Sequence, residues 1–349
     1  MAVSESFYGR TGEGDVRAFD ITNASGASVR IIEYGATVAS VSMPGRDGSF
    51  ADILSGFDTL EGFLQYSNYQ GMTVGPYCNR IGSAKFAVDG KEYKLTANEK
   101  GVTNLHSAGE LSHRIWRGEK AGDNSVVMKI SREDGVGGYP GNIDAQVVFT
   151  LTDDNELKLE YTAVSDKKTC LNFTNHAYFN LDGFDGGEII DTVVRINADY
   201  YTPVDADSIP LGRLDPVEGT PLDLRSGKKL SDGIDEDFEQ LRLVGGYDHN
   251  FCINGYDGTL KEFCFCVSEK SGRTLTGYTT LPGVQLYTGN FLKGAPGKGG
   301  KPVAYRTGFC LETQYYPDTP NNPTFPQCFF DAGEEYRSVT VYKFGVQDK

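Results

Sequence analysis

One carboxylate stands in an otherwise apolar and aromatic stretch, GFCLETQYYPDTPNNPTFP, which begins at Gly308 and ends at Pro326. The residues before the proline and asparagine turn are typical of a β-strand, in which successive side chains point to opposite faces. The pattern predicts that Glu312 points away from the aliphatic face. Its face is shared with Cys310, Gln314 and Tyr316, and the opposite face carries Phe309, Leu311, Thr313 and Tyr315.

The chain has four histidines, and three of them lie in polar clusters: His106 in TNLHSAGE, His176 in LNFTNHAYFNL and His249 in YDHNFCI. In the second cluster, strand alternation separates an apolar face from a face of amides, hydroxyls, an imidazole and a phenol. Such a strand has one side in the core and the other toward water or a polar ligand. We therefore expect His176 and Tyr178 on the polar side, although any one histidine taken alone is more often a hydrogen-bonded structural residue.

The spacing of these residues does not match metal or serine chemistry. None of the usual zinc-ligand spacings occurs, and His106 and His113 are too far apart to form a helical pair. No Gly-x-Ser-x-Gly nucleophile motif is present. Two more polar clusters, VGPYCNRIG with Asn79 and Arg80 and LPGVQLYTGNFL with Gln285, add hydrogen-bonding groups. The chemistry that remains is proton transfer and hydrogen bonding.

Short alternating runs bounded by Gly, Asp, Asn and Pro must position these residues, and such runs predict β-strands. The clearest runs cover residues 29–43, 126–134, 145–152, 156–165, 260–269 and 337–344. Helical periodicity is brief, at 58–68 and 232–243, and no strand–helix–strand alternation suggests a dinucleotide fold. We expect a mostly antiparallel all-β protein that forms one domain over residues 1–349. The glycine-rich segment 292–302 is expected to be a flexible surface loop, with a lid over a site as the alternative.

Composition limits the partners and the compartment. The 349 residues contain 33 Lys and Arg against 48 Asp and Glu, and the net charge of −15 disfavours nucleic acid and anionic membranes as partners. The N-terminal segment lacks a signal-peptide pattern, and no window is apolar enough to cross a bilayer. Seven cysteines form an odd set that fits reduced thiols better than disulfides. We therefore expect a cytoplasmic protein; its oligomeric state is not predicted.

Seven motifs in this order resemble the aldose 1-epimerase (galactose mutarotase) family: GPYCNRIG, NLHSAGE, GGYPGN, TNHAYFNL, YDHNF, LPGVQLYTGNFL and GFCLETQYYPDTPNNPTFP. The resemblance covers nearly the whole chain. It implies a large twisted antiparallel β-sandwich, called a supersandwich, with few short helices and an open sugar cleft. It also implies an isomerase that needs no cofactor and interconverts the α and β anomers of hexoses such as D-galactose and D-glucose.

The resemblance also assigns roles to residues. It implies that Glu312 is the general base, that His176 is the general acid, and that His106 supports the acid near the ring oxygen of the sugar. It further implies that the sugar hydroxyls are hydrogen-bonded by Asn79, Arg80, Tyr178, Asp248 and Gln285. It implies no metal. The chain departs from the family pattern in two places: Ser107 and Ala108 replace a glycine pair, and Pro76 and Cys78 stand where arginine and alanine are more common.

Ordinary pKa values of about 4.3 for Glu and 6.5 for His would leave Glu312 ionised and His176 protonated between about pH 4 and 7. We expect neighbouring carboxylates to raise the pKa of His176. Two other functions fit the same residues. A glycoside hydrolase would use Glu312 and Asp248 as its two carboxylates, and a sugar-binding module would use the polar face for hydrogen bonds and Tyr287 for stacking.

Overall fold

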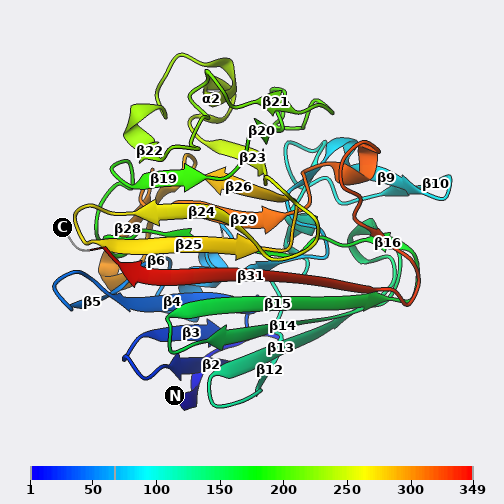
Figure 1. Ribbon diagram of the computed structural model, residues 1–349. Coiled ribbons are helices and arrows are strands. Elements are labelled where there is room, and N and C mark those ends of the chain that lie inside the picture. The colour runs from blue at the N-terminus through cyan, green and yellow to red at the C-terminus, as the bar shows by residue number, and fades with distance from the viewer. Residues whose placement is uncertain (1, 67, 348–349) are drawn as a thin grey trace.

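The fold is built almost entirely from antiparallel strands, as a computed structural model of the chain shows (Figure 1). The structure describes residues 2–66 and 68–347. The six strand runs expected from the sequence all form strands, and the prediction of an all-β antiparallel protein with few short helices is confirmed. The helices of the described residues are α1 (Leu60–Gln65) and α2 (Glu239–Val244), together with short 3₁₀ turns.

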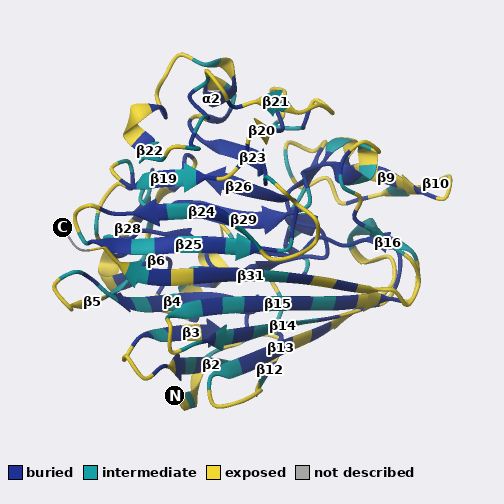
Figure 2. Ribbon diagram, in the orientation of Figure 1, coloured by how far each residue is buried: buried dark blue, intermediate teal, exposed yellow. Residues whose placement is uncertain are grey.

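A nine-stranded sheet runs across the molecule (Figure 1). Burial alternates along β15, as expected for an antiparallel strand with one face on the core and one face in solvent (Figure 2). The strands, in sheet order, are β12 (Arg117–Lys120), β13 (Ser125–Arg132), β14 (Ile143–Leu151), β15 (Glu156–Ser165), β31 (Glu335–Val346), β25 (Arg273–Thr279), β24 (Lys261–Val267), β19 (Val193–Ile196) and β22 (Lys228–Lys229).

A second sheet, formed by the N-terminal part of the chain, packs against the first. Its strands are β1 (Ala2–Thr11), β2 (Gly14–Thr22), β3 (Ser28–Ile32), β4 (Thr37–Pro44) and β5 (Phe50–Asp52). One continuous cluster of buried side chains joins the sheets, and it includes Phe19 and Val41 of the second sheet with Val147 and Leu159 of the first. This shared core supports the prediction of one domain.

A five-stranded sheet carries the polar motifs: β21 (Asp215–Pro216), β20 (Tyr200–Tyr201), β23 (Asp248–Cys252), β26 (Gly283–Tyr287) and β29 (Cys310–Gln314). Every residue of β23, β26 and β29 is buried, in contrast to the alternation of β15 (Figure 2). One face of these strands lies on the hydrophobic core, and connecting segments cover the other face. The register places Asn250, Gln285 and Glu312 side by side.

Short two-stranded pairs tie the covering segments to the body of the protein. They are β6 (Leu54–Ser55) with β18 (Tyr178–Phe179), β7 (Thr73–Val74) with β17 (Thr174–Asn175), β8 (Arg80–Ile81) with β11 (Asn104–Leu105), β9 (Lys85–Val88) with β10 (Lys91–Lys94), β16 (Thr169–Cys170) with β30 (Phe329–Phe330), and β27 (Lys293–Pro296) with β28 (Pro302–Ala304). These pairs fix the loops that carry His106, His176 and Arg80.

The glycine-rich segment 292–302, expected to be a surface loop, is largely exposed but takes part in a strand pair that the sequence did not predict. Strands β27 and β28 form a hairpin, and the buried ammonium group of Lys298 between them donates to Asp52 Oδ2 at 2.6 Å and to the carbonyl of Leu54 at 2.9 Å. A buried charge of this kind requires a fixed partner. No helix among the described residues has the length and apolar character needed to span a bilayer.

Candidate active site

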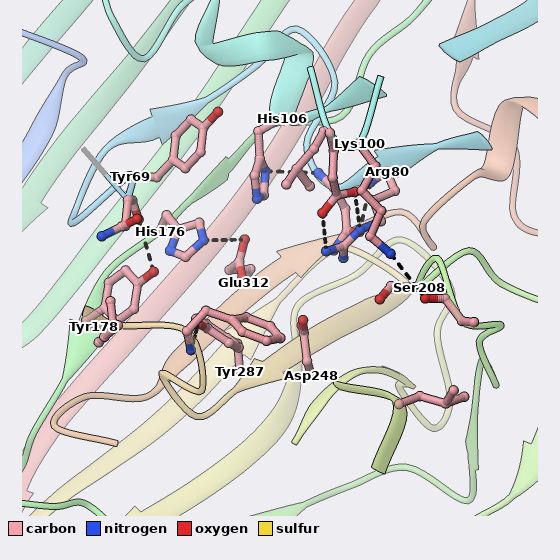
Figure 3. Close-up of a pocket in the computed structure, with 18 residues that line it drawn as sticks. Tyr69, Arg80, Lys100, His106, His176, Tyr178, Ser208, Asp248, Tyr287 and Glu312 are labelled. Atoms are coloured by element: carbon pink, nitrogen blue, oxygen red, sulfur yellow. Dashed lines mark hydrogen bonds and ion pairs between the residues drawn. The ribbon is translucent and has the colours of Figure 1, made fainter. Parts of the chain in front are cut away.

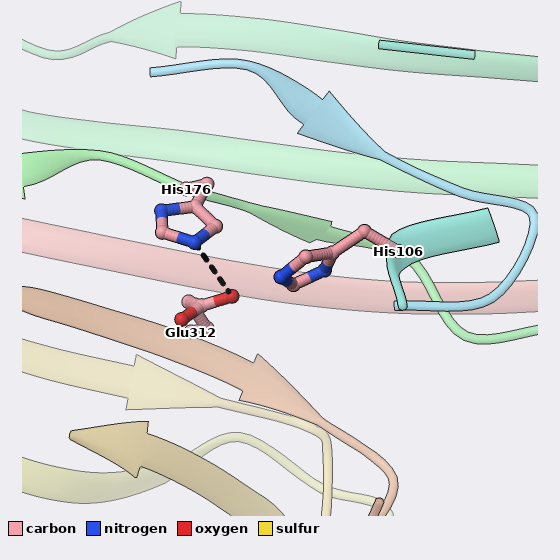
Figure 4. Close-up of side chains that lie close together, drawn as sticks. All are labelled: His106, His176 and Glu312. Carbon is pink, nitrogen blue, oxygen red and sulfur yellow. Dashed lines mark ion pairs between the residues drawn. The ribbon is translucent and has the colours of Figure 1, made fainter. Parts of the chain in front are cut away.

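His176 and Glu312 face each other at the floor of a cavity (Figures 3 and 4). The distance from His176 Nε2 to Glu312 Oε2 is 3.6 Å, and both side chains are almost fully buried. Glu312 Oε2 has no hydrogen-bond partner among the described residues. A buried carboxylate oxygen without a partner costs folding free energy, so a site that retains one is a candidate for function.

Backbone pairing brings the two residues together from distant parts of the sequence. Glu312 lies in the middle of β29, and His176 lies in the short break between β17 and β18. Phe179 and Phe309 exchange two backbone hydrogen bonds of 2.7 and 2.9 Å, which fasten the histidine segment to the start of β29. The expected alternation on β29 is confirmed, because Phe309 and Leu311 belong to the hydrophobic core while Glu312 lines the cavity.

Two tyrosines hold the plane of the His176 ring. The Tyr178 ring stacks on it with centroids 4.9 Å apart and an interplanar angle of 22°, and Tyr69 lies at 5.9 Å and 21°. The hydroxyl of Tyr178 donates to the carbonyl of Asn68 at 3.0 Å, so its hydrogen is already used within the protein. Offset stacking of this kind restricts rotation of the imidazole. Tyr178 therefore lines the cavity mainly as a support for His176.

His106 lies beside His176 and is held in one tautomer. The backbone N–H of Asn79 donates to His106 Nδ1 at 3.1 Å, and the backbone N–H of His106 donates to the backbone carbonyl of Asn79 at 3.1 Å. An imidazole nitrogen that accepts carries no hydrogen, so the hydrogen of the neutral ring is on Nε2. That N–H points toward Glu312 (Figure 4). His106 is thus a hydrogen-bond donor to any ligand at the cavity floor.

The backbone of the His106 loop lies in the left-handed region. His106, Ser107 and Ala108 have φ values of 52°, 51° and 56°. Glycine adopts this region without steric cost, which explains the glycine pair usual at the last two positions. Ser107 offsets part of the cost, because its Oγ donates to the carbonyl of Tyr77 at 2.8 Å and accepts from the Tyr77 N–H at 3.0 Å.

Arg80 and Glu99 form a bidentate ion pair at one side of the cavity (Figure 3). Arg80 Nε donates to one carboxylate oxygen at 2.8 Å, and an Arg80 Nη donates to the other at 2.9 Å. This geometry fixes a guanidinium that lines the cavity, where its other N–H groups can donate to oxygen atoms of a ligand. The side-chain oxygen of Asn79, in contrast, accepts from the backbone N–H of Arg80 at 2.8 Å.

Asp248 faces the cavity from β23 and is held from below by a chain of amides. Gln285 Nε2 donates to Asp248 Oδ1 at 2.7 Å, and Gln314 Nε2 donates to Gln285 Oε1 at 3.1 Å and to Asn250 Oδ1 at 3.1 Å. Gln285 therefore orients Asp248 and is not among the cavity-lining residues. Gln314 shares the side of Glu312, as the alternation predicts, and its amide bonds to Gln285 and Asn250.

The cavity has a volume of about 480 Å³ and is polar at the floor and partly apolar at the rim. It brings together seven of the eight residues predicted for the site, with Gln285 behind them. It is lined by Asn68, Tyr69, Asn79, Arg80, Glu99, Lys100, Leu105, His106, His176, Tyr178, Ala206, Ser208, Leu243, Asp248, Tyr287, Phe291, Leu292 and Glu312.

Burial dominates the electrostatics of the site. It lowers the pKa of His176 to about 4, whereas the sequence led us to expect a raised value. The expectation was wrong because burial removes the solvation of the imidazolium, and this loss outweighs the opposing effect of a backbone hydrogen bond. Burial, with the charge of Asp248, raises the pKa of Glu312 well above its ordinary value, and Arg80 opposes this shift. Burial likewise lowers the pKa of His106 and raises that of Asp248.

The potential ligand atoms of His106, His176 and Glu312 lie within 4.8 Å of one another. Two imidazoles and a carboxylate at this spacing could in principle bind a cation. The tautomer of His106 argues against this use. Its Nδ1 accepts from Asn79, so its Nε2 carries the hydrogen and offers no lone pair to a cation. The donor set fits proton transfer and hydrogen bonding better than metal coordination.

Several cavity residues were missed by the sequence reasoning. Tyr69 and Glu99 lie in irregular polar segments, where no periodicity indicates a direction for the side chain. Lys100 and Asp207 join two such segments across the rim through an ion pair of 2.8 Å. The exposed aromatic ring of Phe291 was signalled only by its place within the polar motif that contains Gln285.

Comparison with known proteins agrees with this geometry. The profile of the aldose 1-epimerase family matches residues 17–343. Galactose mutarotase from Rattus norvegicus is 40% identical over 350 residues, covering 99% of each chain. Aldose 1-epimerase from Escherichia coli K12 is 38% identical over 331 residues, covering 94% of this chain and 95% of the relative.

Solved structures show the same fold. A GalM/aldose epimerase homologue from C. elegans superimposes with a TM-score of 0.87 at 29% identity, covering 99% of this chain and 100% of the other. Galactose 1-epimerase from Lactobacillus acidophilus NCFM superimposes with a TM-score of 0.87 at 26% identity, with full coverage of both chains. The chain belongs to the aldose 1-epimerase family.

Proposed function

We propose that this protein is an aldose 1-epimerase, a cofactor-independent isomerase that interconverts the α and β anomers of hexoses such as D-galactose and D-glucose. The observation that carries the proposal is the pair formed by Glu312 and His176, which face each other at 3.6 Å on the floor of a cavity large enough for a sugar. The names of the relatives, galactose mutarotase and aldose 1-epimerase, support the same reaction.

The reaction needs one base and one acid on two oxygens of the same carbon. Glu312 takes the proton of the anomeric hydroxyl O1 while His176 gives a proton to the ring oxygen O5, the C1–O5 bond breaks, and C1 becomes a carbonyl carbon. Rotation about C1–C2 presents the other carbonyl face. On reclosure, Glu312 returns its proton to O1 and His176 takes back the proton of O5. Each transfer requires an approach of about 2.6–3.2 Å between heavy atoms.

The opposite pKa shifts suit these roles. A histidine with a lowered pKa gives up its proton more readily, and a glutamate with a raised pKa takes one more readily. The same shifts make the charged pair of imidazolium and carboxylate less populated than an uncharged pair with the proton on Glu312. We expect the reaction to proceed from the charged form, because only that form can donate to O5 and accept from O1.

Hydrogen bonds orient the sugar for these transfers. We assign the hydroxyl contacts to Arg80, Asp248 and the Nε2–H of His106, because each presents a polar group to the cavity while its other groups are held by protein partners. Gln285 acts through Asp248, and Asn79 acts through His106 and the Arg80 backbone. We also propose a cytoplasmic location, which the seven free buried cysteines support.

Polarimetry tests the function directly. Freshly dissolved α-D-galactose or α-D-glucose changes its optical rotation slowly in water, and the protein should accelerate the approach to the same final rotation. A change in the final rotation together with new reducing ends from a glycoside would indicate a hydrolase. Sugar binding by calorimetry without any acceleration would indicate a binding module. Either result would replace the assignment as an epimerase.

A further inference from the structure

The edge of the His176 ring opposite Glu312 is occupied by a thiol. Cys310 Sγ lies 3.5 Å from His176 Nδ1, a hydrogen-bonding distance for sulfur. Nε2, on the other edge of the ring, faces Glu312 (Figure 4). His176 is thus held on its two faces by Tyr178 and Tyr69 and on its Nδ1 edge by Cys310.

The backbone dictates this contact. Cys310 is two residues before Glu312 on β29, so strand alternation points both side chains to the same face. The paired backbone hydrogen bonds of Phe179 and Phe309 hold the His176 segment beside Cys310. Close approach is possible because Gly308 has no side chain: a Cβ there would lie 3.0 Å from Tyr178 Cβ.

The thiol is suited to partner Nδ1 through the proton cycle of the histidine. Cys310 is fully buried, and burial, together with the charges of Glu312 and Asp248, raises its pKa well above the ordinary value, so it remains a thiol. A thiol is a weak donor and a weak acceptor. Its S–H can donate to an unprotonated Nδ1, and its sulfur can accept from a protonated Nδ1. The contact therefore persists when the ring changes its protonation state.

We infer that Cys310 is a positioning residue for the acid step: by occupying Nδ1, its thiol makes Nε2 the nitrogen that exchanges a proton with the substrate. The consequence for catalysis rests on the proposed function, whereas the contact itself does not. His106 offers a parallel, because Asn79 occupies its Nδ1 and leaves Nε2 to the cavity. The two histidines use different partners to present the same ring edge. The fixed backbone donor holds the hydrogen of His106 on Nε2, whereas the sulfur at His176 can accept from Nδ1–H and so leaves Nε2 as the nitrogen that loses and regains a proton.

Alanine and serine replacements of Cys310 separate this role from packing. Both variants leave a similar small void, and they differ by one hydroxyl group that can hydrogen-bond to Nδ1. We expect Cys310→Ala to lower kcat by about 10–100-fold, the range found when a metal-ligating histidine loses the partner of its other ring nitrogen, with little change in KM. Cys310→Ser should recover most of that loss. Equal kcat values in the two variants, or an unchanged kcat in Cys310→Ala, would overturn the inference.

A buried thiol away from the site serves as the matched control. Cys266 lies on β24 in the hydrophobic core, and Cys266→Ala should lower thermal stability without lowering kcat. If it lowered kcat as much as Cys310→Ala, the effect at Cys310 would be attributed to general loosening of the core, and the inference would be abandoned.

Nitrogen-15 NMR of the imidazole rings tests the contact without any assay of activity. The Nδ1 resonance of His176, assigned by its absence in His176→Asn, should shift in Cys310→Ala and move back in Cys310→Ser, while the His106 signals stay in place. An Nδ1 resonance typical of a nitrogen without a hydrogen bond in the unchanged protein would refute the inference, even if neither cysteine variant folded. Failure of the proposed function would show instead as absence of mutarotation by the unchanged protein.

Discussion

Glu33 and Glu312 are buried to nearly the same degree, with 3% and 2% of their surface exposed, yet their surroundings differ completely. Glu33 lies between the N-terminal sheet and β12 and accepts hydrogen bonds from the backbone N–H of Arg17 at 2.8 Å, the Arg17 Nε at 3.1 Å and the N–H of Gly118 at 2.9 Å. Glu312 Oε2, in contrast, has no hydrogen-bond partner among the described residues; the imidazole of His176 lies at 3.6 Å, and His106 belongs to the same cluster.

The difference separates a structural carboxylate from a reactive one. A carboxylate whose lone pairs are filled by fixed donors ties segments together and has no capacity left for chemistry. A carboxylate that is buried without donors retains its basicity and destabilises the fold. Burial alone does not distinguish the two roles; the number of filled lone pairs does.

The largest expected difference between Glu312 and Glu33 is the effect on kcat when each is replaced by glutamine. Glu312→Gln removes the base and should lower kcat by about 10²–10⁴-fold, because a positioned proton-transfer group contributes about that factor. Binding of the sugar should be largely retained, as measured by calorimetry. Glu33→Gln should keep the kcat of the unchanged protein at a temperature where it is folded.

The control for this contrast is circular dichroism, which should show folded protein in both cases. Mutarotation at the original rate by Glu312→Gln would remove Glu312 from the role of base. A loss of activity in folded Glu33→Gln would erase the distinction between the two carboxylates.

The same two variants should change stability in opposite directions. Glu33→Gln removes the buried one of the two carboxylates that pair with Arg17, the other being Glu5, and should lower the free energy of unfolding by about 1.5–3 kcal/mol. Glu312→Gln removes a buried ionisable group without donors and should raise it by about 0.5–2 kcal/mol. Urea denaturation at neutral pH measures both values, and changes of the same sign would contradict the comparison.

The free energy of unfolding should depend on pH, because burial shifts the pKa values of His249, His176 and Glu312. Burial lowers the pKa of His249 to about 3 and of His176 to about 4, so the unfolded chain binds protons below about pH 6.5 while the folded chain does not. Above pH 6.5 the two histidines do not reduce the free energy of unfolding. As the pH falls below 6.5, each histidine lowers that free energy by about 1.4 kcal/mol per pH unit. Glu312 acts in the opposite sense, because its raised pKa means that its contribution is lost as the pH rises.

Two variants test which residues cause the dependence of the unfolding free energy on pH. His249→Gln should make the acid slope of the unfolding free energy shallower between pH 6 and 4, and Glu312→Gln should flatten the alkaline side. Urea titrations at several pH values measure both slopes. An unchanged acid slope in His249→Gln would mean that the buried imidazole is not the group that takes up the proton on unfolding.

Glu99 is an intermediate case, since it is a paired carboxylate inside the site, and it should give the smallest effect. Glu99→Gln weakens the grip on Arg80 but leaves the acid and the base in place. We expect KM to rise by about 2–10-fold, equivalent to the loss of one hydrogen bond of ordinary strength, with kcat less affected. Steady-state polarimetry measures both constants. A change in kcat alone would place Glu99 in the chemical step.

Regular alternation made part of the site predictable from the sequence. On β29 the two faces are set by the two-residue period, and the structure has Leu311 in the core and Glu312 in the cavity. The face of His176 and Tyr178 was predicted in the same way, although the expected single strand is two short bridges with the histidine between them.

Other features depended on contacts that no periodicity encodes. Tyr69 and Glu99 reach the cavity from turns, and the hairpin of 293–304 is fixed by the burial of Lys298. The shift of the His176 pKa was predicted with the wrong sign, because the depth of burial depends on the segments that cover the sheet. The expectation counted the charges near the ring and left out the solvent that the fold removes.

The complete burial of β23, β26 and β29 has a consequence for how the family can diversify. These strands carry the base, Asp248 and its supporting amides, and their backbone amides should exchange with deuterium only when the whole domain unfolds. The rim segments with Lys100, Ser208 and Phe291 line the cavity but carry neither the base nor the acid. Swapping rim loops is therefore a route to altered sugar preference that leaves the proton-transfer machinery intact.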